Sequence, residues 1–231
     1  TLSAQTPVPE WQAGVDKMKS LIQTNPAQAS EEVGELLKGK NKKNVDLVTS
    51  VAHVYLDAGK LTEAQEYLAM AKKADNKDPK VSVLEGDIAL AQKNIGQACQ
   101  LYEQAIYFDP NCKEAYLKYA QAYKSASPAL AIEKLEQLKT VDPNCLEADR
   151  ELAEVYYSSN RFGKAAEMYA KFIDTPLATE DDMLKYAFAL FLNHDFEKSL
   201  QVAQKGLQKN ARHAAFNRLV MYNNTDLKRY E

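Results

Sequence analysis

Residues 146–176, LEADRELAEVYYSSNRFGKAAEMYAKFIDTP, contain two amphipathic segments separated by a short polar turn. In the first segment, apolar residues recur three and four positions apart up to Tyr156, which is the spacing of one helical face. In the second segment, the small residue Ala165 precedes the large residue Tyr169 by four positions, so both lie on the same face of a helix. The stretch therefore predicts two short helices joined by a turn and closed by Pro176.

The same pair of segments recurs along the chain with a period of about 34 residues. A small residue followed four positions later by a larger one occurs at Ala64/Leu68, Ala98/Tyr102, Ala131/Leu135, Ala165/Tyr169 and, in degenerate form, Ser199/Ala203. Successive small residues are 34, 33, 34 and 34 positions apart. Prolines follow at the same period, at Pro110, Pro143 and Pro176. The period predicts stacked helix pairs in which the small residues let two backbones approach closely.

Two details of the pattern vary between copies. The third copy is one residue short in its inter-helix turn, where Ser127-Pro128 predicts an N-cap followed by proline at the first helical position. The second copy is weaker upstream, because Glu85-Gly86 stands where other copies carry an apolar residue and alanine. Neither change breaks the period.

In period, small residues, aromatic positions and terminal prolines, the chain resembles the tetratricopeptide repeat family, whose unit is a helix–turn–helix of about 34 residues. The resemblance covers residues 45–211 in five units. It implies an all-α fold, a right-handed α-solenoid, whose first helices line a concave groove that binds peptides or proteins. The expected organisation is a processed or flexible N-terminus over 1–10, a divergent helical pair over 11–44 that caps the array, and the first part of an incomplete further repeat over 212–231. A native C-terminus that frays is the alternative for this last segment.

Composition excludes several classes of protein. About 45% of residues are hydrophobic and 26% are charged, which is ordinary for a globular chain and excludes wholesale disorder. A net charge of −3 does not match a nucleic acid. The longest apolar run, Tyr186 to Leu192, is much shorter than the ~20 residues of a transmembrane helix. Three cysteines cannot form a disulfide-stapled scaffold.

No pattern in the sequence indicates catalysis or a cofactor. The histidines His53, His194 and His213 are far apart in the sequence, and none has acidic or cysteine neighbours at metal-ligand spacing. Glycines are too scattered for a phosphate loop, and no nucleophile elbow is present. We therefore expect no catalytic residues, no metal and no cofactor.

The resemblance places the groove on first-helix positions one residue beyond the packing face. Of these positions we select, as partner-binding candidates, His53, Asp87, Gln121, Glu154, Tyr157, Leu184, Phe188 and Phe191. Family members that clamp a C-terminal carboxylate use Lys and Asn at the first two such positions. Because Thr49 and His53 stand there instead, a clamp for chaperone tails is disfavoured. These groove positions become strongly apolar in the fifth unit. The apolar face there either contacts further repeats or a C-terminal segment, or it binds a partner.

The expected function is a non-catalytic protein-interaction scaffold that holds a peptide or protein in the groove. One alternative is the non-catalytic arm of a larger enzyme, and another is a self-associating assembly subunit. Self-association would use Phe216, Leu219 and Val220, giving a homodimer through the C-terminal end. The opening Leu2-Ser3-Ala4-Gln5 resembles the start of a mature chain after signal-peptide cleavage, which favours a bacterial exported protein of the periplasm or envelope; an arbitrary start and a cytoplasmic location remain open.

Overall fold

The computed structural model describes residues 7–228 of the chain. In that range the regular structure is helical throughout, with thirteen α-helices and one short 3₁₀ helix and without a β-strand. The all-α class predicted from the repeat period is therefore confirmed. The residues of the proposed processing site, Leu2 to Gln5, lie outside the described range.

Helix contacts divide the chain into two compact units, with the boundary between Tyr119 and Ala120. Unit 1 contains α1 (Gln12–Leu21), α2 (Pro26–Leu36), the 3₁₀ helix η1 (Gly39–Lys43), α3 (Val45–Asp57), α4 (Leu61–Ala74), α5 (Pro79–Ala91) and α6 (Ile95–Phe108). The boundary falls within α7 (Lys113–Tyr123). Unit 2 contains α8 (Pro128–Val141), α9 (Leu146–Ser158), α10 (Phe162–Phe172), α11 (Glu180–Leu192), α12 (Phe196–Lys209) and α13 (Ala214–Asp226).

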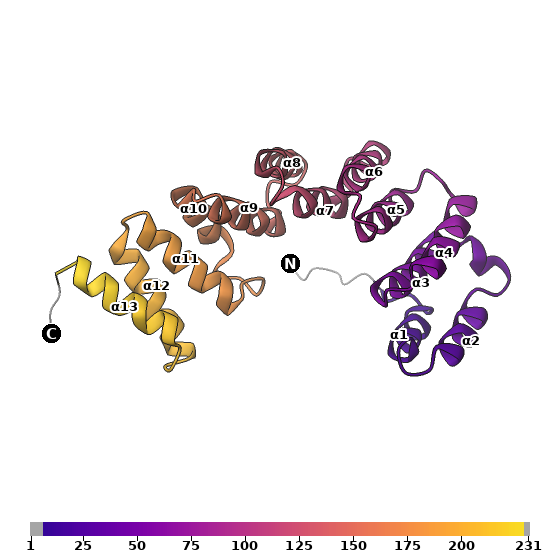
Figure 1. Cartoon of the computed structure of the whole chain (residues 1–231), viewed down its shortest axis with the longest axis horizontal. Coiled ribbons are helices and arrows are strands. Elements are labelled where there is room, and N and C mark those ends of the chain that lie inside the picture. The colour runs from indigo at the N-terminus through magenta and orange to yellow at the C-terminus, as the bar shows by residue number, and fades with distance from the viewer. Residues whose placement is uncertain (1–6, 229–231) are drawn as a thin grey trace. The chain divides into compact units, whose positions relative to one another are not determined.

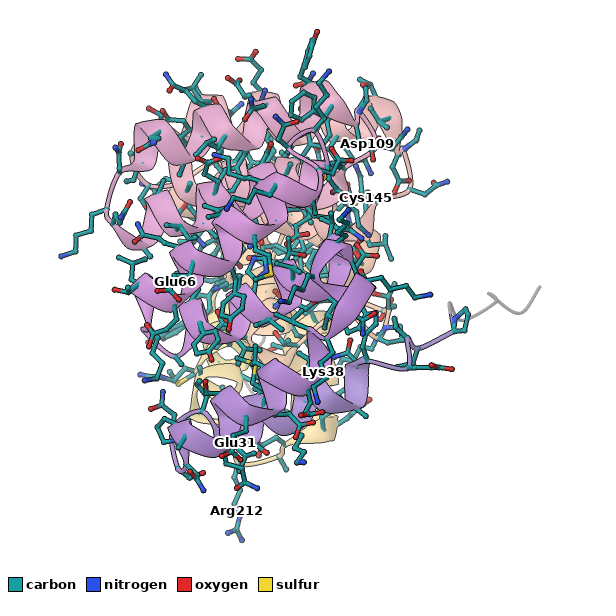
Figure 2. The ribbon with its side chains drawn as sticks, turned by 90° about the vertical axis from the view of Figure 1, so that its right-hand side faces the viewer. Glu31, Lys38, Glu66, Asp109, Cys145 and Arg212 are labelled. Carbon is teal, nitrogen blue, oxygen red and sulfur yellow. The ribbon has the colours of Figure 1, made fainter. Side chains whose placement is uncertain are left out.

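Within each unit, consecutive helices pack as pairs (Figure 1): α3 with α4 and α5 with α6 in unit 1, and α9 with α10 and α11 with α12 in unit 2. The repeated small residues lie in the interior of the protein. Ala64, Ala98, Ala131 and Ala165 are fully buried. At the degenerate fifth position, buried Ser199 donates a hydrogen bond from Oγ to the Ala187 carbonyl at 2.8 Å. Charged side chains, among them Glu31, Lys38 and Glu66, cover the exposed surface of unit 1 (Figure 2).

The turn between first and second helices has one conformation in four repeats. A residue with positive φ closes it: Gly59 (φ 74°), Lys93 (63°), Asn160 (57°) and His194 (62°). The amide of the next residue then bonds back five residues, as Lys60 N does to the Tyr55 carbonyl at 2.8 Å. This is the Schellman ending of a helix, which favours glycine at the left-handed position. The third repeat has one residue fewer here, so its turn lacks this motif.

Local capping and loop contacts position the helices. Pro26 is the first residue of α2, and the Asn25 side chain caps that helix by accepting a hydrogen bond from the Gln28 main-chain amide. Ser127 precedes α8 with Pro128 at the first helical position, but its side chain makes no capping hydrogen bond. The polar segment 39–44 contains the 3₁₀ helix η1, and the Asn41 side-chain amide donates to the Leu36 carbonyl at 3.0 Å.

Candidate functional site

In unit 1 the predicted groove residues His53 and Asp87 come together from the consecutive first helices α3 and α5. His53 Nε2 lies 2.9 Å from Asp87 Oδ2. The same carboxylate accepts hydrogen bonds from Tyr102 Oη at 2.7 Å and from Lys118 Nζ at 2.8 Å. Three donors, from α3, α6 and α7, thus converge on a carboxylate whose side chain is only 10% exposed. We call these four residues the Asp87 node.

The electrostatics of the Asp87 node keep the carboxylate charged. Burial by itself would raise the pKa of Asp87, but the His53 hydrogen bond and the Lys118 charge lower it below the usual range. Burial opposes the positive charge of His53 and of Lys118, yet the contacts with Asp87 raise the pKa of both groups. Burial and the nearby carboxylate also raise the pKa of Tyr102. Asp87 is thus held by three donors from its own unit and braces α3, α5, α6 and α7 against one another.

A matching cluster lies in unit 2 around Glu154 on α9. Tyr169 Oη donates to Glu154 Oε1 at 2.8 Å, and Lys185 Nζ lies 3.0 and 2.9 Å from the two carboxylate oxygens. We call these three residues the Glu154 node. In both nodes the tyrosine follows the acid by 15 positions and the lysine follows it by 31. Gln121, predicted as a groove residue beside Glu154, instead donates from Nε2 to Glu151 Oε1 at 2.8 Å.

The tyrosines and lysines of the two nodes are not among the residues selected from the sequence. The sequence does contain a pattern that could have identified them, because a tyrosine follows 15 residues and a lysine 31 residues after both Asp87 and Glu154. In the repeat pattern the tyrosines serve packing alone, and Lys118 and Lys185 do not lie on the selected helix positions. The pairing of a first-helix lysine with an acid one repeat earlier becomes visible only when the helices are packed.

The apolar groove candidates of unit 2 have a different environment. Leu184, Phe188 and Phe191 project from α11, are half-buried, and pack against a core formed by α11, α12 and α13. Tyr222 of α13, which is 43% exposed, extends this surface, since its ring centroid lies 6.1 Å from that of Phe191. We call these four residues the aromatic face. Tyr222 follows Phe188 by 34 positions, so the repeat period could have identified it.

A further aromatic ring borders this surface, since Phe196 meets Phe191 edge-on at 5.5 Å. Tyr157, the groove candidate of α9, instead packs edge-on against Phe162 of α10 at 5.7 Å. A hollow of about 180 Å³ opens beside the aromatic face. Its lining residues are Phe191, Leu192, His194, Phe196 and Asp226. Apolar walls with few polar groups are typical of sites that accept apolar side chains.

Unit 1 has a larger and more polar hollow of about 370 Å³, to which the Asp87 node contributes His53. It is lined by Pro9, Trp11, Asp46, Thr49, Ser50, His53, Lys80, Val83 and Glu114. Lys80 forms an ion pair with Asp46, and Thr49 donates its hydroxyl to the Val45 carbonyl at 2.8 Å. Much of the polarity of this hollow is therefore already satisfied by partners within unit 1.

The residues expected to mediate self-association lie mostly inside the protein. Phe216 and Leu219 are fully buried in the core shared by α11, α12 and α13, and Val220 is half-buried. The Phe216 ring lies where a side chain on Gly206 would be, about 2.6 Å from the Cβ that glycine lacks. Phe216 and Leu219 therefore hold α13 onto α12 and are not themselves available to a second copy.

Among residues 7–228, no three side chains of the His, Cys, Asp or Glu type converge in a metal-binding arrangement. None of the helices described combines the length and apolar content needed to cross a bilayer.

Several solved structures share this fold. PilW, a widely conserved type IV pilus biogenesis factor, matches with a TM-score of 0.68 at 16% identity, covering 93% of this chain and 100% of PilW. PilF of Pseudomonas aeruginosa matches with a TM-score of 0.65 at 16% identity, covering 90% of this chain and 95% of PilF. YrrB, a TPR protein with an unusual peptide-binding site, matches with a TM-score of 0.57 at 14% identity, covering 88% and 97%. These identities establish similarity of fold alone.

No curated protein matches the chain. The family model for the tetratricopeptide repeat matches residues 49–111 and 121–178, together just over half of the chain. These segments contain the buried alanines Ala64, Ala98, Ala131 and Ala165 and the turns closed by Gly59, Lys93 and Asn160. With the helical pairs and the neighbouring folds in agreement, the fold is an all-α solenoid, and the chain belongs to the tetratricopeptide repeat family.

Proposed function

We propose that this chain is a non-catalytic scaffold that binds a peptide or protein segment on the aromatic face of α11 and α13. The observation that carries the proposal is a contrast between first-helix positions. Asp87 and Glu154 already bond to donors from their own units, whereas Leu184, Phe188, Phe191 and Tyr222 present apolar surface to solvent. Aromatic side chains in such positions dominate binding energies at protein interfaces.

The chemistry expected of the partner follows from this surface. An apolar or aromatic side chain would fill the hollow beside Phe191 and Phe196, where it displaces water from apolar walls. The ion pairs of the Glu154 node would border the bound segment and contribute little, because exposed pairs are worth about 0–1 kcal/mol. A peptide rich in apolar residues is therefore favoured over a strongly charged one.

A random peptide library displayed on phage supplies a defined probe for the proposal. Selected peptides are synthesised, and their affinity for the chain is measured by fluorescence anisotropy. We expect enrichment of apolar and aromatic residues, and a loss of roughly 30-fold in affinity for Tyr222→Ala, corresponding to about 2 kcal/mol for an interface anchor. His53→Gln in unit 1 is the matched control and should bind normally. The proposal would be contradicted if the selected peptides bound Tyr222→Ala and Phe188→Ala with unchanged affinity but bound His53→Gln more weakly.

Self-association is a second proposal, favoured by α13 itself. Met221 is 55% exposed and occupies the repeat position held by Ala52, Gly86, Ala120, Ala153 and Ala187 in the preceding units, where the second helix packs. A methionine there would clash with a second helix placed as in those units. The face of α13 carrying Met221 therefore suits a differently shaped occupant, such as a second copy of the chain.

Export to the periplasm or envelope also stands as a proposal, supported by the opening residues Leu2 to Gln5. Expression of the complete reading frame in bacteria, followed by separation of periplasm from cytoplasm, tests it. Recovery of processed chain beginning at Thr1 in the periplasmic fraction is the expected result. Recovery of unprocessed chain in the cytoplasm alone would contradict it.

A further inference from the structure

The two nodes differ in one residue that titrates near neutral pH. Both contain an acid, a tyrosine and a lysine at the same offsets. Only the Asp87 node receives a fourth residue, His53, from the preceding repeat. At the corresponding place in unit 2 stands Gln121, which bonds to Glu151 and has no titratable proton. Unit 2 therefore provides an internal reference for the effect of His53.

Both ring nitrogens of His53 face oxygen acceptors. Nε2 lies 2.9 Å from a carboxylate oxygen of Asp87, and Nδ1 lies 2.9 Å from the main-chain carbonyl of Thr49. Neither oxygen carries a proton to donate, and a neutral imidazole has only one N–H. Only the imidazolium form satisfies both contacts. In the neutral ring, one nitrogen would place its lone pair against an oxygen at hydrogen-bonding distance, so the ring would have to turn.

The other charged groups around His53 come from α3, α5 and α7. Asp87 and Lys118 act on it directly and with opposite signs, and Asp46, Lys80 and Glu114 line the same hollow. The contacts with Asp87 outweigh burial and Lys118, so the pKa of His53 is raised above 6.5. A raised pKa in the folded state means that protonated His53 stabilises the fold fully below pH ~6.5. That contribution is lost as the pH rises through the folded-state value.

We propose that His53 is a pH-sensitive tie between α3 and α5 that sets the shape of the hollow in unit 1. In the protonated form it joins Thr49 of α3 to Asp87 of α5. Loss of the proton releases the Thr49 contact first, because the charge-assisted bond to Asp87 is the stronger of the two. The ring then turns within the hollow, and the surface that this hollow offers at mildly acidic pH differs from the one at mildly alkaline pH.

Trp11 provides the readout. It lines the same hollow as His53, and it is the single tryptophan of the 231-residue chain. Of the ionisable side chains that line the hollow, Lys80 has a raised pKa because it bonds to Asp46, and His53 is the histidine among them, the residue type whose ordinary pKa lies near neutral pH. Between pH 5.5 and 9, a change in tryptophan emission therefore reports on His53.

The experiment uses the full chain and follows two signals over pH 5.5–9: the His53 imidazole resonances by NMR and the emission of Trp11. We expect both to follow one transition with a midpoint above 6.5. His53→Gln, which copies the residue of unit 2, should abolish the emission change, whereas His194→Asn should leave it intact. Asp87→Asn should move the His53 midpoint downward, because the attracting charge is gone.

Two results would overturn the proposal. A His53 midpoint at or below 6.5 in the unmodified chain would show that the ring is not held as an imidazolium. A His53 titration with no change in Trp11 emission, or an emission change that survives His53→Gln, would show that the tie does not shape the hollow. Circular dichroism of each variant at pH 5.5 and 9 separates these results from unfolding.

Discussion

At some positions, a side chain on another helix determines which residue type fits. Gly86 is the clearest example. It lies within the continuous helix α5, at a position where the other first helices of the array carry alanine, and this makes the second copy look weak in sequence. A Cβ at this position would lie 2.5 Å from the ring of Tyr102 on α6. Glycine is needed because Tyr102 fills the space and carries its hydroxyl to Asp87.

Gly86→Ala is therefore expected to destabilise the fold despite the better helix propensity of alanine. Overpacking costs about 1–3 kcal/mol, against a propensity gain of at most ~1 kcal/mol. Gly96→Ala in α6 is the matched control, because nothing lies within 4 Å of its missing Cβ, and it should be neutral or slightly stabilising. Urea unfolding of both variants checks the prediction. Equal midpoints for the two would show that Tyr102 can move aside at little cost.

The two nodes predict a shared effect of removing one hydroxyl. Tyr102→Phe and Tyr169→Phe each leave a partly buried carboxylate with one hydrogen bond fewer. Hydrogen bonds to charged groups are worth about 1.5–3 kcal/mol, so both variants should lose stability in this range. Tyr107→Phe, at a side chain that is 82% exposed, should change nothing measurable. Thermal unfolding of the three variants tests whether the nodes stabilise the fold. Melting temperatures of Tyr102→Phe and Tyr169→Phe that equal that of the parent chain would refute it.

At the scale of helices and turns, periodicity predicted the elements well because each helix buries one regular face. The spacings of three and four residues that locate the buried alanines are short, so they are visible within a single helix of 10–14 residues. The inter-helix turns were less visible. Lys93 and His194 adopt the left-handed conformation although their residue types do not indicate it, whereas Gly59 and Asn160 are of types that favour this position.

In these turns, replacing a residue by glycine and replacing glycine by another residue are expected to change the stability of the fold in opposite directions. Lys93→Gly should stabilise the protein by up to about 1 kcal/mol, because a left-handed conformation costs a non-glycine residue roughly 1–2 kcal/mol while glycine loses more chain entropy on folding. Gly59→Ala should destabilise it by a similar amount for the same reason. Chemical unfolding at pH 7 measures both. If Lys93→Gly destabilised the protein, the contribution of the lysine side chain to stability would exceed the free-energy cost of its left-handed backbone conformation.

The buried alanines give a second prediction for the elements. Ala98 and Ala165 are fully buried where two helices approach, so Leu at either site should destabilise by roughly 1–3 kcal/mol through overpacking. Thermal melts of the two variants provide the check. Melting temperatures equal to that of the parent chain would show that the helices can separate to admit a larger side chain.

At the scale of the molecule, the sequence predicted the fold class and the family, but only part of the candidate site. It identified Leu184, Phe188 and Phe191, since apolar residues off the packing face stand out within one helix. It also selected His53, Asp87 and Glu154 as partner-binding residues without showing that their partners lie within the chain. Those partners are about 15 or 31–34 residues away, so they depend on how the repeats stack rather than on any single helix.

Exposed apolar surface at α13 predicts concentration-dependent association of the whole protein. Leu192, Met221 and Tyr222 are 44%, 55% and 43% exposed. Light scattering across a range of concentrations should show a larger species that Met221→Ser weakens. Phe216→Glu is expected instead to loosen α13, because it places a charge in the core. A monomer at every concentration would contradict self-association while leaving the peptide-binding proposal intact.

Recognition on the aromatic face, and not at the charged positions of unit 1, is the central claim. Hydrogen–deuterium exchange of the full chain, with and without a saturating peptide selected from the displayed library, locates the bound segment directly. We predict slowed exchange in α11 and α13, with α3 and α5 unchanged. Protection confined to α3 and α5, around His53 and Asp87, would contradict the claim.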